Sequence, residues 1–98
     1  MTREQVLARL REREAELRSA GVVRLSLFGS AARGDSRPDS DIDLMAAFDE
    51  ERRISLLDVV GIQLGLQEWL GQPVDLVEEG TLKPRVWKSV EPEAIRVF

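Results

Sequence analysis

Three acidic residues are the main candidates for chemistry in this sequence. Asp41 and Asp43 stand at the start of the apolar stretch DIDLMAAF, and Asp75 lies in a later stretch, PVDLV. Side chains two positions apart on a strand share one face, so Asp41 and Asp43 would lie roughly 6–7 Å apart and repel each other away from water. A hard divalent cation such as Mg²⁺, which prefers carboxylate and phosphate oxygens, would compensate that repulsion. Taken alone, the Asp41–Asp43 pair could also be a pair of solvated strand-end residues.

A glycine-serine pair strengthens the chemical interpretation. Gly29 and Ser30 follow the apolar run VVRLSLF, and a turn of this kind after a strand offers backbone N–H groups and a hydroxyl to a phosphate. Such a pair alone is more often structural. Here ten residues separate Ser30 from the D-x-D motif of Asp41 and Asp43. At about 7% usage of each residue type, this combination would arise by chance roughly two times in a thousand chains of this length.

The apolar pattern predicts the elements that must position these groups. Thr2 and Gln5 form a capping-box pattern, which predicts one helix that runs to Ser19 and is stopped by Gly21. The order of elements predicts an α+β fold, a small mixed sheet flanked by helices. The predicted strands cover residues 22–28, 41–48, 73–77 and 94–98; a loop over 29–40 includes a helical turn at 30–33; and further helices cover 55–70 and 82–90.

The helix predicted over residues 55–70 carries many large apolar residues. We therefore expect it to be largely buried. Gly61 and Gly65 lie four positions apart on it and would allow another element to pack closely. The apolar positions behind this expectation are Leu56, Leu57, Val60, Leu64 and Trp69.

Composition narrows the function classes. With 98 residues, the chain is expected to form one domain over residues 1–98. It has no cysteine and no histidine, so a metal site would use oxygen ligands, which favours Mg²⁺ or Mn²⁺ over zinc. A net charge of −4 with dispersed basic residues argues against an extended nucleic-acid surface. No apolar run approaches the roughly 18 residues that span a bilayer and no signal pattern opens the chain, so we expect a cytoplasmic protein.

The string FGSAARGDSRPDSDIDL resembles the G-S-x10-D-x-D signature of the nucleotidyltransferase superfamily that includes DNA polymerase β. Together with SLLDVVGIQLGLQEWLGQPVDLV and LKPRVWKSVEPEAIRVF, it is similar over nearly the whole chain to the smallest members, the bacterial minimal nucleotidyltransferase (MNT) antitoxins. The resemblance implies a nucleotidyltransferase fold, a mixed sheet with flanking helices. It also implies transfer of a nucleoside monophosphate from a triphosphate to a hydroxyl.

The resemblance further implies roles for the acidic residues. Asp41 and Asp43 match the D-x-D pair that binds the catalytic Mg²⁺ ions, of which two are expected, with Mn²⁺ as a substitute. Asp75 matches the third carboxylate, which completes the metal site and serves as the base for the acceptor hydroxyl. Two metals can stabilise both the attacking and the leaving oxygen of an in-line displacement.

The same resemblance assigns the phosphate-binding residues and the substrate. Gly29 and Ser30 match the residues that hold the triphosphate, which is expected to be ATP. Arg33 is positioned to pair with phosphate oxygens, although a solvated loop cation is the alternative for this residue.

Three functions remain compatible with the sequence. The resemblance implies an adenylyltransferase that attaches AMP to a tyrosine of a HEPN-domain toxin, as the antitoxin of a type VII toxin–antitoxin system. A second function is a non-catalytic antitoxin that masks its toxin, although such a protein would not need three acids in one place. A third is transfer to a small molecule or to RNA ends, against which the short chain and the acidic charge count. The sequence leaves homo- or hetero-oligomers open.

Overall fold

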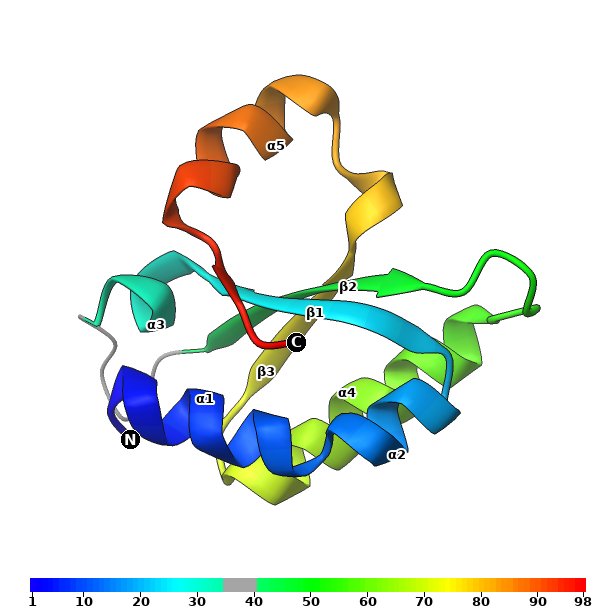
Figure 1. The fold of residues 1–98 in the computed structure, drawn as a ribbon, viewed down its shortest axis with the longest axis horizontal. Coiled ribbons are helices and arrows are strands. Elements are labelled where there is room, and N and C mark those ends of the chain that lie inside the picture. Colours follow the sequence, from blue (N-terminus) through cyan, green and yellow to red (C-terminus); the bar gives the residue numbers. More distant parts are fainter. Residues whose placement is uncertain (35–40) are drawn as a thin grey trace.

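Four strands make up the sheet in the computed structural model, which describes residues 1–34 and 41–98. Their order across the sheet is β3-β2-β1-β4, with β2 and β3 parallel and the other two pairs antiparallel (Figure 1). The predicted mixed sheet of an α+β fold is therefore confirmed. The strands are β1 (Val22–Phe28), β2 (Ile42–Phe48), β3 (Val74–Glu78) and β4 (Ile95–Arg96).

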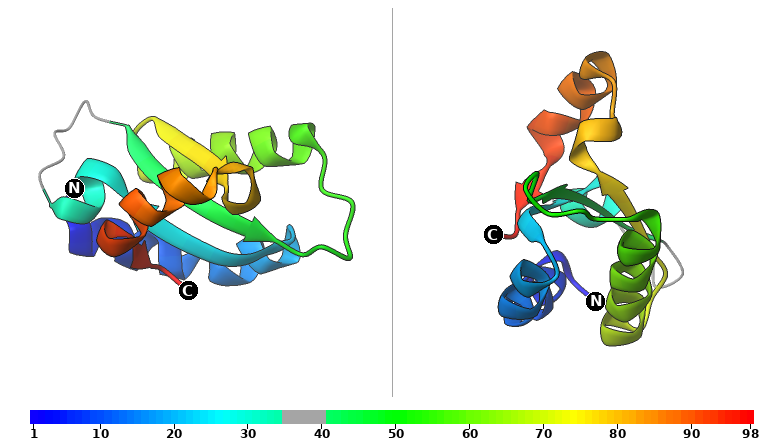
Figure 2. Two further views of the ribbon diagram at one scale, coloured as in Figure 1. Left: turned by 90° about the horizontal axis from the view of Figure 1, so that it is seen from above. Right: turned by 90° about the vertical axis from the view of Figure 1, so that its right-hand side faces the viewer.

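Helices lie on both sides of the sheet. α1, α2 and α4 cover one face, whereas α5 and two short 3₁₀ turns, η1 and η2, rise from the other (Figure 2). The helical turn predicted at 30–33 is confirmed as α3, and residues 35–40 of the predicted loop lie outside the described residues. None of the helices described is long and apolar enough to cross a bilayer. The helical elements are α1 (Arg3–Glu12), α2 (Glu14–Ser19), α3 (Gly29–Arg33), α4 (Leu56–Leu70), η1 (Glu79–Thr81), α5 (Pro84–Val90) and η2 (Glu91–Glu93).

The N-terminal helix differs from the prediction in one respect. It starts with the predicted capping box of Thr2 and Gln5, but it divides into α1 and α2 at Arg13. The backbone of Arg13 leaves the helical region, and its N–H donates to the carbonyl of Leu10 at 3.0 Å, three residues back. This tighter turn ends α1, so the prediction of one continuous helix was wrong.

The hydrophobic core lies between the sheet and the layer of α1, α2 and α4. Leu27 and Leu44 are paired across β1 and β2 and are completely buried, as is Leu10 of α1. Because side chains alternate along a strand, the residues next to these positions point to the opposite face of the sheet. Asp43, which precedes Leu44, therefore lies on the face that carries α5.

α4 is far more exposed than its sequence predicts. Its bounds agree with the prediction, since Ser55 caps it in a reciprocal pair with Asp58 and Gly71 ends it. Only Leu66 and Leu70 are buried, so the expectation of a largely buried helix was wrong. The reason is geometric: the helix carries apolar residues on more than one side, but a helix resting on a sheet buries one side only. The exposed large residues are Leu56, Leu57, Val60 and Leu64, at 79%, 81%, 41% and 55% of their full accessibility.

The two glycines of α4 do not serve the packing expected of them. A Cβ atom added at Gly61 or at Gly65 would meet nothing within 4 Å in the described part of the chain. The close approach that glycine permits is therefore not used inside the protomer, and the prediction of close packing at these positions was wrong.

Candidate active site

Parallel pairing of β2 with β3 places two of the predicted acids side by side. Asp43 is the register partner of Asp75, and the flanking pairs on both strands are apolar and buried. Paired residues of parallel strands point to the same side, so both carboxylates lie on the sheet face opposite the core. Asp41 immediately precedes β2, is exposed, and lies close enough for its negative charge to act on Asp43.

The electrostatics of Asp43 reflect this grouping. Partial burial raises the pKa of the Asp43 carboxyl above its ordinary value, and the negative charges of Asp75 and Asp41 raise that pKa further. The positive charge of Arg33 acts in the opposite direction and lowers it. The protein therefore places a carboxylate where a negative charge is costly, which is typical of a functional site.

The donor chemistry of this group suits a hard divalent cation. Carboxylate oxygens are the ligands that Mg²⁺ and Mn²⁺ prefer, and the chain has neither cysteine nor histidine to favour zinc. Within residues 1–34 and 41–98, no three acidic side chains are gathered closely enough to hold a metal ion. Carboxylates repel one another at short range, so closer gathering requires a compensating cation. The residues fit Mg²⁺ in their chemistry and in the side of the sheet they share.

The Gly29 turn lies directly against Asp43. Phe28, the last residue of β1, pairs with Asp43 across the sheet, and α3 begins at the next residue. Gly29 has a φ of 71°, in the left-handed region that favours glycine. A Cβ added to Gly29 would collide with the Asp43 carboxylate. Glycine is therefore needed here for two reasons, its backbone conformation and the close approach of the carboxylate, and the half-exposed Ser30 follows on the same turn.

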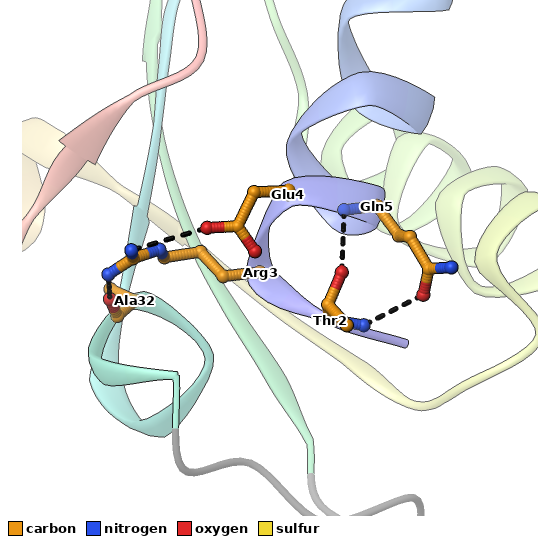
Figure 3. Close-up of polar contacts among 5 residues, drawn as sticks. All are labelled: Thr2, Arg3, Glu4, Gln5 and Ala32. Carbon is orange, nitrogen blue, oxygen red and sulfur yellow. Dashed lines mark hydrogen bonds and ion pairs between the residues drawn. The ribbon is translucent and has the colours of Figure 1, made fainter.

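α3 is held in place from two sides. On one side, its own residues Ala31 and Ala32 are buried, at 2% and 3% exposure. From the other side, a guanidinium nitrogen of Arg3 donates to the carbonyl oxygen of Ala32 at 3.2 Å (Figure 3). Arg3 stands in the first turn of α1, next to the capping box of Thr2 and Gln5, so the start of α1 and the turn that carries Gly29 are fixed to each other.

Arg33, at the end of α3, has a partner that the sequence does not indicate. One of its guanidinium nitrogens lies 3.1 Å from a carboxylate oxygen of Glu93, which belongs to η2. Both side chains are about half exposed. Glu93 is 60 residues away from Arg33 in the sequence, and no local motif points to the pair. Arg33 therefore pairs directly with Glu93, while its charge also acts on Asp43.

The predicted site residues thus fall into two groups. Asp43, Asp75 and Gly29 are brought together by strand pairing and by the turn, and Asp41 is close enough for its charge to act on Asp43. Ser30 and Arg33 follow on α3, and Arg33 is directed to Glu93. This arrangement offers carboxylate oxygens, a glycine turn and a guanidinium within one region of the surface. Such groups can bind a cation and a phosphate.

Comparison with known proteins agrees with this fold and site. The family described as nucleotidyltransferase domain matches residues 4–97. The protein adenylyltransferase MntA of Thermococcus cleftensis is 36% identical over 98 residues, which cover 99% of this chain and 97% of that protein. A solved structure assigned as a minimal nucleotidyltransferase is 46% identical, with a TM-score of 0.80 over 97% of this chain and 95% of that one.

A more distant likeness concerns the fold alone. A Shewanella oneidensis complex of a tri-AMPylated HEPN toxin with an MNT antitoxin matches at 18% identity, with a TM-score of 0.63 over 91% of this chain and 70% of that one. The family match and the close relatives extend over nearly the whole sequence. The chain therefore belongs to the minimal nucleotidyltransferases of the DNA polymerase β superfamily, and it is a nucleotidyltransferase.

Proposed function

We propose that this nucleotidyltransferase is a Mg²⁺-dependent protein adenylyltransferase that transfers AMP from ATP to a tyrosine hydroxyl of a HEPN-type toxin. In this proposal it acts in the cytoplasm as the antitoxin of a type VII toxin–antitoxin pair. The observation that carries the proposal is the half-buried Asp43, which pairs with Asp75 and lies against the Gly29 turn. The adenylyltransferase name of the Thermococcus cleftensis relative and the AMPylated toxin in the Shewanella oneidensis complex support the choice of AMP and of a HEPN acceptor.

The proposed reaction is an in-line displacement at the α-phosphorus of ATP. The acceptor oxygen forms a new bond to that phosphorus, the bond to the pyrophosphate oxygen breaks, and pyrophosphate leaves with the electron pair. Asp75, exposed on the face it shares with Asp43, takes the proton of the acceptor hydroxyl. Asp41 and Asp43 would hold Mg²⁺, which when bound neutralises charge on the phosphates and on the leaving group.

The α3 turn would hold the triphosphate in this proposal. Gly29 has no side chain to keep a phosphate away from the backbone, and Ser30 brings a hydroxyl to the same turn. Arg33 supplies a planar cation that can pair with two phosphate oxygens. Its contact with Glu93 competes for that guanidinium, so Glu93 would weaken nucleotide binding.

The Glu93→Gln variant is expected to bind ATP more tightly, with a KM lowered by about two- to fivefold and kcat little changed. Exposed ion pairs are worth about 0–1 kcal/mol, which sets this range. The measurement is steady-state transfer at varied ATP. Glu91→Gln, in the same 3₁₀ turn, is the matched control for loss of one negative charge. An equal decrease of KM in both variants, or none in Glu93→Gln, would contradict the pairing of Arg33 with phosphate.

The acceptor and the acids are tested together by transfer of label. The purified full chain, Mg²⁺ and ATP labelled at the α-phosphate are mixed with a co-expressed HEPN partner. We expect label on the toxin with the unaltered chain and at least about a hundredfold less with Asp41→Asn or Asp75→Asn, since Asp41 would hold the cation that neutralises charge in the transition state and Asp75 would take the proton of the acceptor. Asp49→Asn, beyond the other end of β2, is the control and should label normally.

Two outcomes would replace the proposal. If a chain carrying both Asp41→Asn and Asp75→Asn neutralises the toxin in cells as well as the unaltered chain does, the protein acts by masking its toxin. If label appears in a small molecule and not in the toxin, the chain is a nucleotidyltransferase with a small-molecule acceptor. Normal labelling by the single variants would remove the roles assigned to the two carboxylates.

A further inference from the structure

A side-chain hydrogen bond ties the short helix α3 to the start of α1. A guanidinium nitrogen of Arg3 donates to the carbonyl oxygen of Ala32 at 3.2 Å, although the two residues are 29 positions apart in the sequence (Figure 3). A second nitrogen of the same guanidinium lies 3.3 Å from a carboxylate oxygen of Glu4. The planar fork of the guanidinium therefore serves two partners at once, and each of them limits the movement of the Arg3 side chain.

α3 depends on contacts from outside because it is short. A helix of five residues has too few internal hydrogen bonds to offset the entropy lost when its first turn forms. Ala31 and Ala32 hold it against the protein, but each of them buries only a methyl group. The end of α3 borders a hollow of about 650 Å³, which Arg33 and Gly34 line together with the first residues of α1. Packing alone therefore leaves this end of α3 weakly held.

The start of α1 is more firmly placed. Thr2 and Gln5 exchange two hydrogen bonds in the capping box, at 2.8 and 3.1 Å. In the next turns Val6 and Leu10 are buried in the hydrophobic core, at 2% and 0% exposure. Arg3 thus reaches from a helical turn that is capped and anchored to one that is not, so α1 sets the position of the α3 carbonyl.

A second polar contact of α3 would not persist in the proposed reaction. Arg33 pairs with Glu93, but it would leave that carboxylate when it binds the phosphates. The bond from Arg3 to the carbonyl of Ala32 does not involve Arg33. It would therefore still hold the α3 turn after the nucleotide has bound.

We infer that Arg3 is a positioning residue for the nucleotide, because it keeps the α3 turn where Gly29 and Ser30 can hold the triphosphate. The inference rests on the proposed role of that turn. Gly29 lies so near the Asp43 carboxylate that an added Cβ would collide with it, so a displaced turn would also disturb the acid beside it. Arg3 acts through the backbone of α3 and needs no contact with ATP.

Titration calorimetry with ATP and Mg²⁺, in the absence of an acceptor, tests this role. The apparent affinity falls with the fraction of chains whose turn is in place, so Arg3→Met should raise the dissociation constant about three- to tenfold, a range that one hydrogen bond allows. Arg9→Met is the matched control. Arg9 lies on the same helix and donates to the carbonyl of Trp69 at 3.3 Å, so this variant loses an equivalent bond to α4 and should bind ATP normally.

Two further measurements separate positioning from general stability. Arg3→Met and Arg9→Met should lower the midpoint of thermal unfolding by similar small amounts, so lost stability would not explain a difference in ATP affinity. Arg3→Lys keeps the charge but has a single nitrogen in place of the fork, so its affinity should lie between those of the unaltered chain and Arg3→Met. Glu4→Ala should weaken ATP binding less than Arg3→Met does, and it should add nothing in the double variant, because Glu4 acts through Arg3.

The outcomes distinguish this inference from the proposed function. Unchanged ATP affinity in Arg3→Met, or an equal loss of affinity in Arg9→Met, would overturn the positioning role and leave the proposed function standing. An unaltered chain that binds no ATP would overturn the proposed function, and this inference with it.

Discussion

The Asp43→Asn variant is expected to lose nucleotidyl transfer by about 10²–10⁴-fold while keeping its fold. Interactions that neutralise charge in the transition state are worth several kcal/mol, which corresponds to this range of rates. Asp43 is the carboxylate that faces Asp75 and contacts the Gly29 turn, so no other acid of the site can take its place. The measurement is single-turnover transfer with saturating ATP.

The same variant is expected to be more stable than the unaltered chain at neutral pH. Because the pKa of Asp43 is raised in the folded state, the folded chain holds this proton more tightly than the unfolded chain does. The unaltered chain therefore loses stability as pH rises from below the ordinary value of 3.8 through the raised folded pKa, and the loss persists above it. Asparagine carries no such charge, so the variant should be more stable than the unaltered chain above the raised pKa, by a small amount because Asp43 is only partly buried.

Urea unfolding of both proteins at several pH values measures this difference in the free energy of unfolding. The advantage of Asp43→Asn should vanish near pH 3, where Asp43 is protonated in both states. Asp49→Asn removes a carboxylate at the far end of β2 and should keep full transfer. Retained transfer in Asp43→Asn would remove this residue from the site, and a stability gain that persists unchanged at acid pH would show that the gain does not come from the carboxylate's charge.

The Gly29→Ala variant is expected to lose both stability and transfer. Alanine at a φ of 71° costs about 1–2 kcal/mol, and its Cβ would also displace the Asp43 carboxylate. We expect a loss of about 2–4 kcal/mol in the free energy of unfolding, the additional part coming from the collision. A carboxylate shifted by about 1 Å would lower the transfer rate about a hundredfold.

Gly71→Ala is the matched control for the backbone part of this effect. Gly71 has the same φ of 71°, but a Cβ there would meet nothing within 4 Å in the described residues. Gly71→Ala should lower the free energy of unfolding by about 1–2 kcal/mol and leave nucleotidyl transfer intact. In an Asp43→Ala background, Gly29→Ala should cost less than in the unaltered chain, because the collision partner is gone. Equal costs in the two backgrounds would show that the turn does not press on Asp43.

Much of the local structure could be predicted from the sequence, because its signals act over a few residues. The bounds of β1, the turn at α3, and the cap of α4 at Ser55 follow from β-branched runs, glycine and capping patterns, and all three are confirmed. The D-x-D spacing predicted that Asp41 and Asp43 share one side of a strand; Asp43 lies in β2, and Asp41 immediately precedes it. The catalytic and binding roles of these residues remain predictions.

Only the tertiary structure decided which distant residues meet and which side of α4 is covered. Asp75 reaches Asp43 because β3 pairs in parallel with β2, and Glu93 reaches Arg33 because η2 lies close to α3. Neither contact leaves a local pattern, since strand register and the path of the chain depend on how all elements pack. The many apolar residues of α4 predicted burial, but the sheet offers the helix one contact surface, so Leu57 and Leu64 stay exposed. Hydrophobicity shows that a side chain favours burial, and the packing of the whole fold determines whether a partner for it exists within the chain.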